Sequence, residues 1–376
     1  MKQLLYTYII VAILWSFSCT NKRGQEDVED KSEILTLSDH SRNKIRIANL
    51  ANVIDIIPLE SSSHCFLSEI NKIIEFNNDF YILDKIQKKL LVFNKDGKYL
   101  RQIGKRGIGP GEYPNISDFI IDMDSQKIII LSTISSSNIY QYNMDGSFCS
   151  KKEISKSLLW NIISTPTGYI CSTNNFTFTK GDEAYLLYIY DKSFELVNKK
   201  KKVLPLQIHT PVMLSTPFQI LDGTVHYTDP FTNQIYSILG NSETFKSYKI
   251  NLENPVPPEI FANTNRFIKE QLEYDFMMDV YMTKEYILIT YVCNKKYNVI
   301  ILSKDKLKNE ISGAFIGAFP KVYQGHDDTI LSPITMQEYL GNWKYLYSDP
   351  NIESFQEDDN MVIVRWKIKD LNNKRP

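Results

Sequence analysis

The chain of 376 residues carries 43 Lys and Arg against 44 Asp and Glu, which gives a formal net charge of −1. A chain this close to neutral has no overall field to hold nucleic acid or an anionic membrane surface. Its 43% hydrophobic and 12% aromatic residues, with 23 Tyr and 19 Phe, exclude wholesale disorder and favour strands.

The N-terminal residues have the pattern of a targeting segment followed by a tether. Lys2 precedes an apolar run from Leu4 to Trp15, too short to span a membrane, and then Ser16-Phe17-Ser18-Cys19. This ending resembles the lipobox of bacterial lipoproteins and predicts a signal peptide over residues 1–18 with acylation of Cys19. Ser16 replaces the usual Leu, and Ser16-x-Ser18 also suits ordinary signal peptidase, which would release an unlipidated protein. The polar residues 19–33 are predicted to form a flexible lipid-anchor tether.

We therefore expect a location in the cell envelope, lipid-anchored to a membrane on the periplasmic side or at the cell surface. The remaining cysteines lie far apart, with no CxxC pair and no zinc-type spacing. They are expected to be small buried hydrophobic side chains, and their three disulfide pairings stay open. These residues are Cys65, Cys149, Cys171 and Cys293.

A unit of about 48 residues repeats along the chain. Leu90–Tyr99 and Ile139–Phe148 each contain a strand, an Asn-x-Asp-Gly turn and a second strand. Asp-Gly supplies the positive φ of a tight hairpin turn, so both segments are predicted hairpins. Equivalent strands recur around Tyr190, Ile238 and Leu302. Two further short strands precede each of these in phase, so each unit is predicted to contain four antiparallel strands.

Such a unit at this period is typical of a β-propeller blade. Residues 34–376 provide about six units once two helical inserts are set aside. The sixth unit has to be assembled from both ends of the chain, from Val53–Leu59 and Met361–Ile368, which would close the ring. We predict an all-β fold, a six-bladed β-propeller of four-stranded antiparallel blades.

The two helical inserts are expected at about residues 257–274 and 335–347. In the first, Pro257-Pro258-Glu259 is a helix start signal, and Ile260, Phe261, Phe267 and Ile268 follow at helical spacing.

One repeat carries a further motif. Phe93–Gly104, followed by Gly107-Ile108-Gly109-Pro110-Gly111-Glu112-Tyr113-Pro114, resembles an NHL-type propeller repeat. With its lipobox and with Glu357–Asn360 before the last strand, the whole chain resembles the six-bladed β-propeller lipoproteins of Gram-negative bacteria. The resemblance implies the fold and an envelope location, and it supplies no catalytic residues.

Motifs for catalysis are missing from the sequence. There is no GxSxG, HExxH or P-loop, and Gly107–Gly111 is predicted to be a turn between blades. Asp122–Gln126 lacks the glycine and the bidentate Glu of a calcium loop. We predict no catalytic residue, no metal and no cofactor.

The histidines are isolated in sequence, although a propeller can bring ligands from several blades to its axis; they are His40, His64, His209, His226 and His326.

Two classes of function stay open. The first is a lipid-anchored binding or scaffold protein for a glycan, a peptide or a protein, with the membrane as its partner through the lipid, no nucleic acid, and a monomeric state. The second is an enzyme of the lyase or lactonase type with its site at the central channel. Acids or histidines converging from several blades would favour the enzyme.

Candidate ligand-binding residues lie in the loops on one face of the propeller. Asn175–Thr179 alternates and is predicted to extend a hairpin that puts two phenylalanines on one side, near an aromatic residue of the next blade. Exposed aromatic rings near charged residues would form a platform for sugar or peptide, whereas the alternative is that the rings pack loop against loop. The candidates are Arg106, Glu112, Tyr113, Phe176, Phe178, Asp229 and Phe231.

Overall fold

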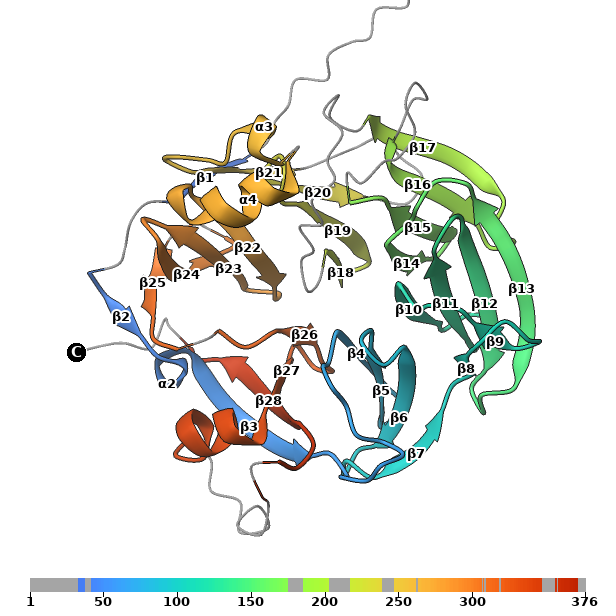
Figure 1. The fold of residues 1–376 in the computed structure, drawn as a ribbon. Coiled ribbons are helices and arrows are strands. Elements are labelled where there is room, and N and C mark those ends of the chain that lie inside the picture. Colours follow the sequence, from blue (N-terminus) through green and yellow to red (C-terminus); the bar gives the residue numbers. More distant parts are fainter. Residues whose placement is uncertain are drawn as a thin grey trace, which may run out of the picture. The chain divides into compact units, whose positions relative to one another are not determined.

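Six small, mainly antiparallel sheets stand around a common axis, which confirms the predicted six-bladed β-propeller (Figure 1). The computed structural model describes residues 33–37, 42–174, 185–202, 217–238, 247–346 and 356–370, except for positions 262, 306, 308, 318 and 357. All of these residues belong to one unit, Glu33–Pro376.

The first three blades each consist of four consecutive strands, ordered from the axis outwards. The first contains β4 (Lys72–Phe76), β5 (Asp79–Asp84), β6 (Lys89–Asn94) and β7 (Tyr99–Gln102). The second contains β10 (Asp118–Asp122), β11 (Lys127–Thr133), β12 (Ser137–Asn143) and β13 (Phe148–Ser155). The third contains β14 (Asn161–Thr165), β15 (Gly168–Ser172), β16 (Tyr185–Asp191) and β17 (Leu196–Lys202).

The fourth and fifth blades have a fifth, parallel strand from the N-terminal part of the chain, which the sequence did not predict. The fourth contains β18 (Phe218–Leu221), β19 (Thr224–Asp229), β20 (Gln234–Ile238), β21 (Ser247–Asn251) and the added β1 (Glu33–Thr36). The fifth contains β22 (Phe276–Met282), β23 (Tyr286–Cys293), β24 (Lys296–Ser303), β25 (Asn309–Phe315) and the added β2 (Lys44–Ile45).

The sixth blade joins the two ends of the chain. Its strands are β26 (Tyr323–Gln324), β27 (Ile330–Ile334), β28 (Val362–Ile368) and β3 (Ala51–Pro58). β3 pairs with β28 in a register that runs from Val362 opposite Pro58 to Ile368 opposite Ala51. A strand from the N-terminal part therefore completes a sheet that the C-terminal part begins, and the side of β28 that faces away from β27 is paired.

The core consists of layers between neighbouring blades. One layer combines Tyr81 and Val92 of the first blade with Phe119, Ile130 and Tyr142 of the second. Each middle strand is therefore covered on both faces, which explains uninterrupted apolar runs such as Ile128–Leu131.

The Asp-Gly turns form as the sequence predicts. Gly97 has φ +76° and Gly146 has φ +91°. A Cβ on Gly97 would lie 2.0 Å from the carbonyl oxygen of Pro58, at the end of the closing strand β3. Glycine is thus required there both for its backbone conformation and for the close approach of two blades.

Short helices interrupt the repeats. They are α2 (Ile47–Leu50), α3 (Pro258–Phe261), α4 (Thr264–Glu270), the 3-10 turn η1 (Gln271–Glu273), α5 (Met336–Glu338) and the π-turn η2 (Tyr339–Trp343). Within the described residues, every helix is too short or too polar to cross a membrane. A small ribbon, β8 (Lys105–Arg106) with β9 (Glu112–Tyr113), connects the first two blades.

Candidate functional site

A cavity of about 680 Å³ runs along the axis, between the inner strands of the blades. Its wall includes residues of β4, β10, β14, β18, β22 and β26, which surround the centre of the ring in Figure 1. Because every blade repeats the same order of strands, these inner strands run in the same direction along the axis. The end where they begin is named the upper mouth, and the other end the lower mouth.

The wall of the cavity changes in character from one end to the other. The upper mouth is charged and consists of Glu69, Asn71, Lys72, Lys85, Asp118 and Lys321. The middle is mainly apolar, with Ile73, Ile120, Ile162, Phe218 and Tyr323. The lower mouth contains Glu75, Met123, Ser164, Gln324 and His326. A volume within the range of small-molecule sites, with an apolar middle and few polar groups, is suited to binding a ligand.

Asp118 organises one side of the upper mouth. Its Oδ1 lies 2.8 Å from Lys72 Nζ and accepts the backbone N–H of Phe119, and its Oδ2 accepts the backbone N–H of Ile162. These contacts join the inner strands of the first three blades. The side chain of Asp118 is 5% exposed, so its charge is compensated almost entirely by these donors.

Glu69 and Lys321 form a second ion pair across the mouth, between the first and sixth blades. Burial raises the pKa of Glu69, but the hydrogen bond and charge of Lys321 outweigh it, and the pKa lies below its usual value. The carboxylate form of Glu69 is therefore favoured.

Lys85 is the third lysine of the upper mouth. It lies in the turn between β5 and β6, where its backbone N–H donates to Asn71 Oδ1 at 2.7 Å. The side chain is half-buried. Burial lowers the pKa of Lys85, Asp118 opposes this effect, and the charges of Lys72 and Lys321 lower the pKa further. Glu69 opposes the effect as well, so the ammonium of Lys85 lies among two cations that disfavour its charge and two carboxylates that favour it.

The lower mouth is neutralised by a different ion pair. Arg365 donates to both carboxylate oxygens of Glu75, at 2.8 and 2.6 Å, and the backbone N–H of His326 donates to the same carboxylate. Burial raises the pKa of Glu75, yet these donors outweigh it and the pKa is lowered. The two ends of the cavity thus differ in charge.

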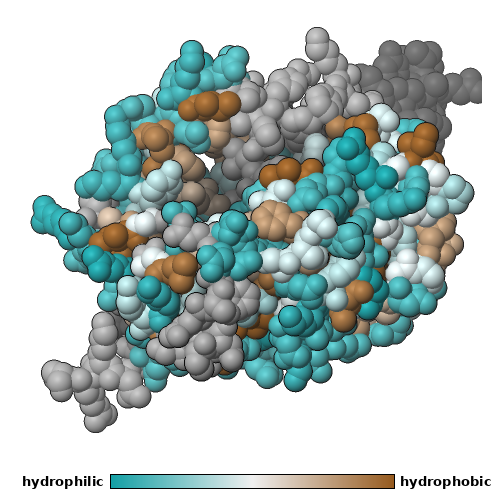
Figure 2. Space-filling view, turned by 60° about the horizontal axis from the view of Figure 1, so that its bottom comes forward, coloured by the Kyte–Doolittle hydropathy of each residue, from teal (hydrophilic) through white to brown (hydrophobic). Residues whose placement is uncertain are grey.

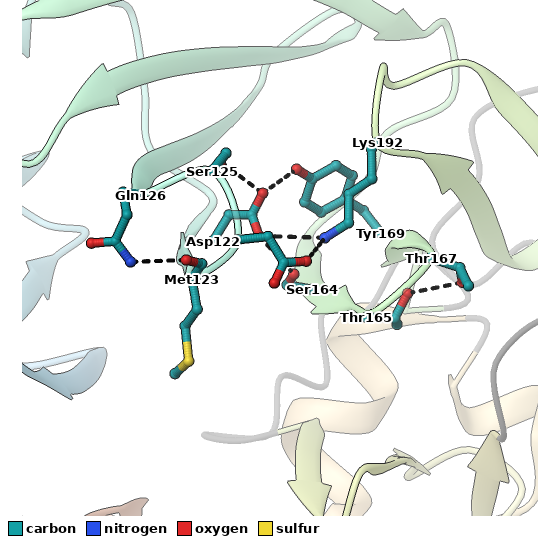
Figure 3. A network of polar contacts seen from close by, with 10 residues as sticks. Asp122, Met123, Ser125, Gln126, Ser164, Thr165, Thr167, Tyr169 and Lys192 are labelled. Atoms are coloured by element: carbon teal, nitrogen blue, oxygen red, sulfur yellow. Dashed lines mark hydrogen bonds and ion pairs between the residues drawn. The ribbon is translucent and has the colours of Figure 1, made fainter.

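Beside the lower mouth, a polar network holds the second and third blades together (Figure 3). Asp122 accepts hydrogen bonds from Tyr169 at 2.7 Å and Ser125 at 2.8 Å, and Lys192 approaches it at 3.4 Å. Lys192 also pairs with Asp124 at 2.8 Å. Because Asp122 is 2% exposed and its oxygens are occupied, this network is structural.

The sequence-predicted residues of the first inter-blade loop have contacts within that loop. Glu112 pairs with Lys105 at 3.0 Å and accepts the backbone N–H of Gly109 at 2.9 Å. Tyr113 is fully buried, and its hydroxyl donates to the carbonyl of Ile103 at 3.0 Å. Arg106 is exposed on β8. These contacts give the loop its shape.

Asp229 and Phe231 lie in the turn after β19. Asp229 is buried, and its carboxylate accepts the backbone N–H of Phe231 and the hydroxyl of Thr232. Phe231 is buried against Phe261 of α3, with ring centroids 4.9 Å apart. Its ring therefore packs the helical insert onto the fourth blade.

The other predicted residues are not part of the described structure: Phe176, Phe178 and Cys19 lie outside the described residues. Among the predicted residues that are described, Arg106, Glu112, Tyr113, Asp229 and Phe231, the structure does not bring any to the cavity wall.

The residues of the upper mouth were not predicted from the sequence, although part of a signal exists. Lys72, Asp118 and Asn161 occupy the first position of the inner strand in three successive blades, each before apolar residues. Polar residues at equivalent positions of a repeat meet around the axis of a propeller. Lys85 and Lys321 come from a turn and from a blade far along the chain, and no local pattern connects them.

Within the described residues, the side chains of His, Cys, Asp and Glu form no cluster of three suited to a metal ion. Of the four cysteines described, Cys65, Cys171 and Cys293 are buried and Cys149 is exposed. The two carboxylates of the upper mouth are each held by a lysine.

The molecular surface offers a weaker candidate than the cavity. In Figure 2, hydrophobic residues lie dispersed among hydrophilic ones on the visible face. Ile108, 97% exposed, is the most exposed of the large hydrophobic side chains described. Single exposed apolar residues are ordinary on protein surfaces, so the axis remains the best candidate site.

Comparison with known proteins identifies a family and a fold. The family model described as "Domain of unknown function (DUF4934)" matches residues 32–367. No curated protein matches the chain. Among solved structures, a Bacteroides fragilis NCTC 9343 protein described as exported is similar over 89% of this chain and 99% of its own, at 20% identity and a TM-score of 0.74. A DUF4221 family member from Bacteroides vulgatus ATCC 8482 is similar over 86% and 99%, at 10% identity and a TM-score of 0.56.

Proposed function

The chain belongs to the DUF4934 family, and we propose that it is a binding protein of the cell envelope whose central cavity takes a ligand. The observation that carries the proposal is the cavity of about 680 Å³, which combines an apolar middle with a charged upper mouth. Such a wall excludes water from a ligand's body and orients its polar end. The ligand classes in this proposal are a glycan, a peptide and a segment of a partner protein.

The proposed location is supported by the sequence. Residues 1–18 have the pattern of a signal peptide, and Cys19 is positioned for acylation. The similar Bacteroides fragilis protein is described as exported. In this proposal a lipid on Cys19 attaches the protein to the membrane through residues 19–33, and the propeller acts as a monomer.

Acids from the first two blades do reach the cavity, namely Glu69, Glu75 and Asp118, but each is held in an ion pair, and this favours binding over lyase or lactonase chemistry. Asp118 is saturated by Lys72 and two backbone donors, and Glu69 is paired with Lys321. A general base needs a free oxygen within reach of a substrate proton. Both carboxylates instead act as counter-ions that hold lysines at the mouth.

A thermal-shift panel of glycans, peptides and divalent metals tests the proposal. A ligand present at one hundred times its Kd should stabilise the protein by about 2.7 kcal/mol. Ile220→Trp should abolish this stabilisation, because Ile220 lines the cavity and is partly exposed, so a larger side chain can fill the space. Ile268→Trp is the matched control, because Ile268 lies on α4 and is 62% exposed. Equal stabilisation of both variants by every active ligand would place binding outside the cavity.

A further inference from the structure

The three lysines of the upper mouth are not equivalent. Lys72 is paired with Asp118, and Lys321 is paired with Glu69. In the part of the chain that the structure describes, Lys85 Nζ makes no hydrogen bond and no ion pair, although the side chain is half-buried and lines the cavity. Three cations and two carboxylates therefore leave one positive charge uncompensated.

The carboxylate nearest in sequence does not neutralise Lys85. Asp84 is fully buried, and its oxygens accept the backbone N–H groups of Ser68 and Gln87 and the side-chain amide of Gln87. These bonds fix the loop before β4 and the turn that carries Lys85. The backbone N–H of Lys85 donates to Asn71, so the residue is held at the mouth by its main chain.

An unpaired cation in a partly desolvated position is unfavourable for the empty protein. Burial disfavours its charged form, and the neighbouring charges of Lys72 and Lys321 add to this effect. A ligand carrying a negative charge would relieve both costs by forming a charge-assisted hydrogen bond.

The rest of the wall indicates what the negative charge is attached to. Behind the upper mouth lie Ile73, Ile120, Ile162 and Phe218, and the lower mouth is neutralised by the pair of Glu75 with Arg365. One end of the cavity therefore attracts an anion, and the middle favours an apolar group.

We propose that the cavity binds an amphipathic anion, whose carboxylate, sulfate or phosphate group is bound by Lys85 and whose apolar body lies between the inner strands. The inference rests on the proposed function, because it names the ligand class of the same cavity. Lys85 is the residue that selects for the charge.

Two related dyes allow the contribution of the negative charge to binding to be measured separately from that of the apolar body. Anilinonaphthalene sulfonate carries a sulfonate on an aromatic body, and phenylnaphthylamine has the same body without the charge. Their fluorescence rises in an apolar site, so a titration of the full mature protein gives the affinity and stoichiometry of each. Lys85→Met removes the charge and keeps the length of the side chain.

We expect the sulfonate dye to bind once per chain, and Lys85→Met to weaken it by about tenfold or more, as the loss of one charged hydrogen bond implies. The uncharged dye should bind the variant and the wild type equally. Lys95→Met is the control, since Lys95 is exposed in the turn between β6 and β7 and its replacement removes the same charge from the molecule. Thermal melting of Lys85→Met should show an unchanged or raised Tm, because the side chain gives up no hydrogen bond.

The outcomes distinguish the two levels of the proposal. Equal weakening of the sulfonate dye by Lys95→Met, or no weakening by Lys85→Met, would overturn the anion site while leaving the cavity as a binding site. If neither dye binds, the amphipathic-anion proposal falls, whereas the thermal-shift panel still decides whether the cavity binds a glycan or a peptide. If Ile220→Trp leaves the binding of both dyes unchanged, the dyes bind outside the cavity and the anion site falls.

Discussion

At the scale of single residues, Asp122 is expected to contribute strongly to stability. It is buried and accepts hydrogen bonds from Tyr169 and Ser125 across the boundary of two blades (Figure 3). Asp122→Ala would leave the buried Tyr169 hydroxyl without this acceptor, at a cost of about 2–4 kcal/mol. Denaturant unfolding measures the loss. Asp124→Ala is the control, because Asp124 is 70% exposed and should have little effect.

The free energy of unfolding should also depend on pH through Asp122. Burial raises the pKa of Asp122, but the hydrogen bonds of Tyr169 and Ser125 and the charge of Lys192 outweigh it, so the folded-state pKa lies below the usual value. The stabilisation is therefore complete above about pH 4, the pKa of an unfolded aspartate, and is lost as pH falls through the lower folded-state pKa. The free energy of unfolding of Asp122→Asn should fall less steeply in this range than that of wild type. Parallel profiles would contradict the assignment.

Two glycines with the same backbone conformation allow strain and close approach to be separated. Gly97 has φ +76° and a Cβ added to it would lie 2.0 Å from Pro58 O, whereas Gly223 has φ +75° and nothing within 4 Å of such a Cβ. Gly223→Ala should cost about 1–2 kcal/mol, the strain of a left-handed residue. Gly97→Ala should cost clearly more, because two blades must move apart. Similar melting temperatures for the two variants would show that the backbone at Pro58 can move away from the added Cβ at little cost in stability.

At the scale of elements, closure of the ring depends on β3. A chain that begins at Asn43 lacks the added edge strand β1 and the buried side chains of Leu35 and Leu37, but it keeps β3 and the closure of the ring. A chain that begins at Glu60 lacks β3, so β28 keeps β27 as its only partner and becomes an exposed edge, with the layer of Ile56, Val362 and Val364 opened. We expect the first chain to melt cooperatively and the second to aggregate. Removal of Asp359–Pro376, which takes away β28 itself, should have the same effect as the second truncation. A soluble, cooperatively melting second chain would contradict closure by β3.

The elements could be predicted because their signals are local. The Asp-Gly turns at Gly97 and Gly146 and the apolar runs of the middle strands repeat in phase, so the blade pattern is visible in sequence. β1 and β2 could not be found in this way. They are short edge strands that pair in parallel with β21 and β25, far along the chain, and nothing in their sequences specifies these partners.

At the scale of the whole molecule, overall composition concealed the candidate site. The formal charge of −1 is a sum over the whole chain, and it does not reveal that three lysines and two carboxylates meet at the upper mouth. The candidate ligand-binding residues expected in the loops included Tyr113 and Phe231, which are buried. An aromatic residue in a loop has the same sequence signal whether it binds a ligand or packs the loop. Which side chains reach the axis depends on the geometry of the complete ring.

Anchoring is also a property of the whole molecule. If Cys19 is acylated, Cys19→Ala should move the protein from the membrane fraction to the soluble fraction, because one acyl chain binds a membrane marginally and the several chains of a lipoprotein hold it firmly. Cys149→Ala is the matched control, since Cys149 is an exposed free thiol of the propeller and its loss should leave fractionation unchanged. Cleavage by ordinary signal peptidase gives a different pattern, in which the wild-type protein is already soluble after salt washing. Mass spectrometry of the mature N-terminus completes the test, because an acylated Cys19 as first residue is compatible only with the lipid anchor.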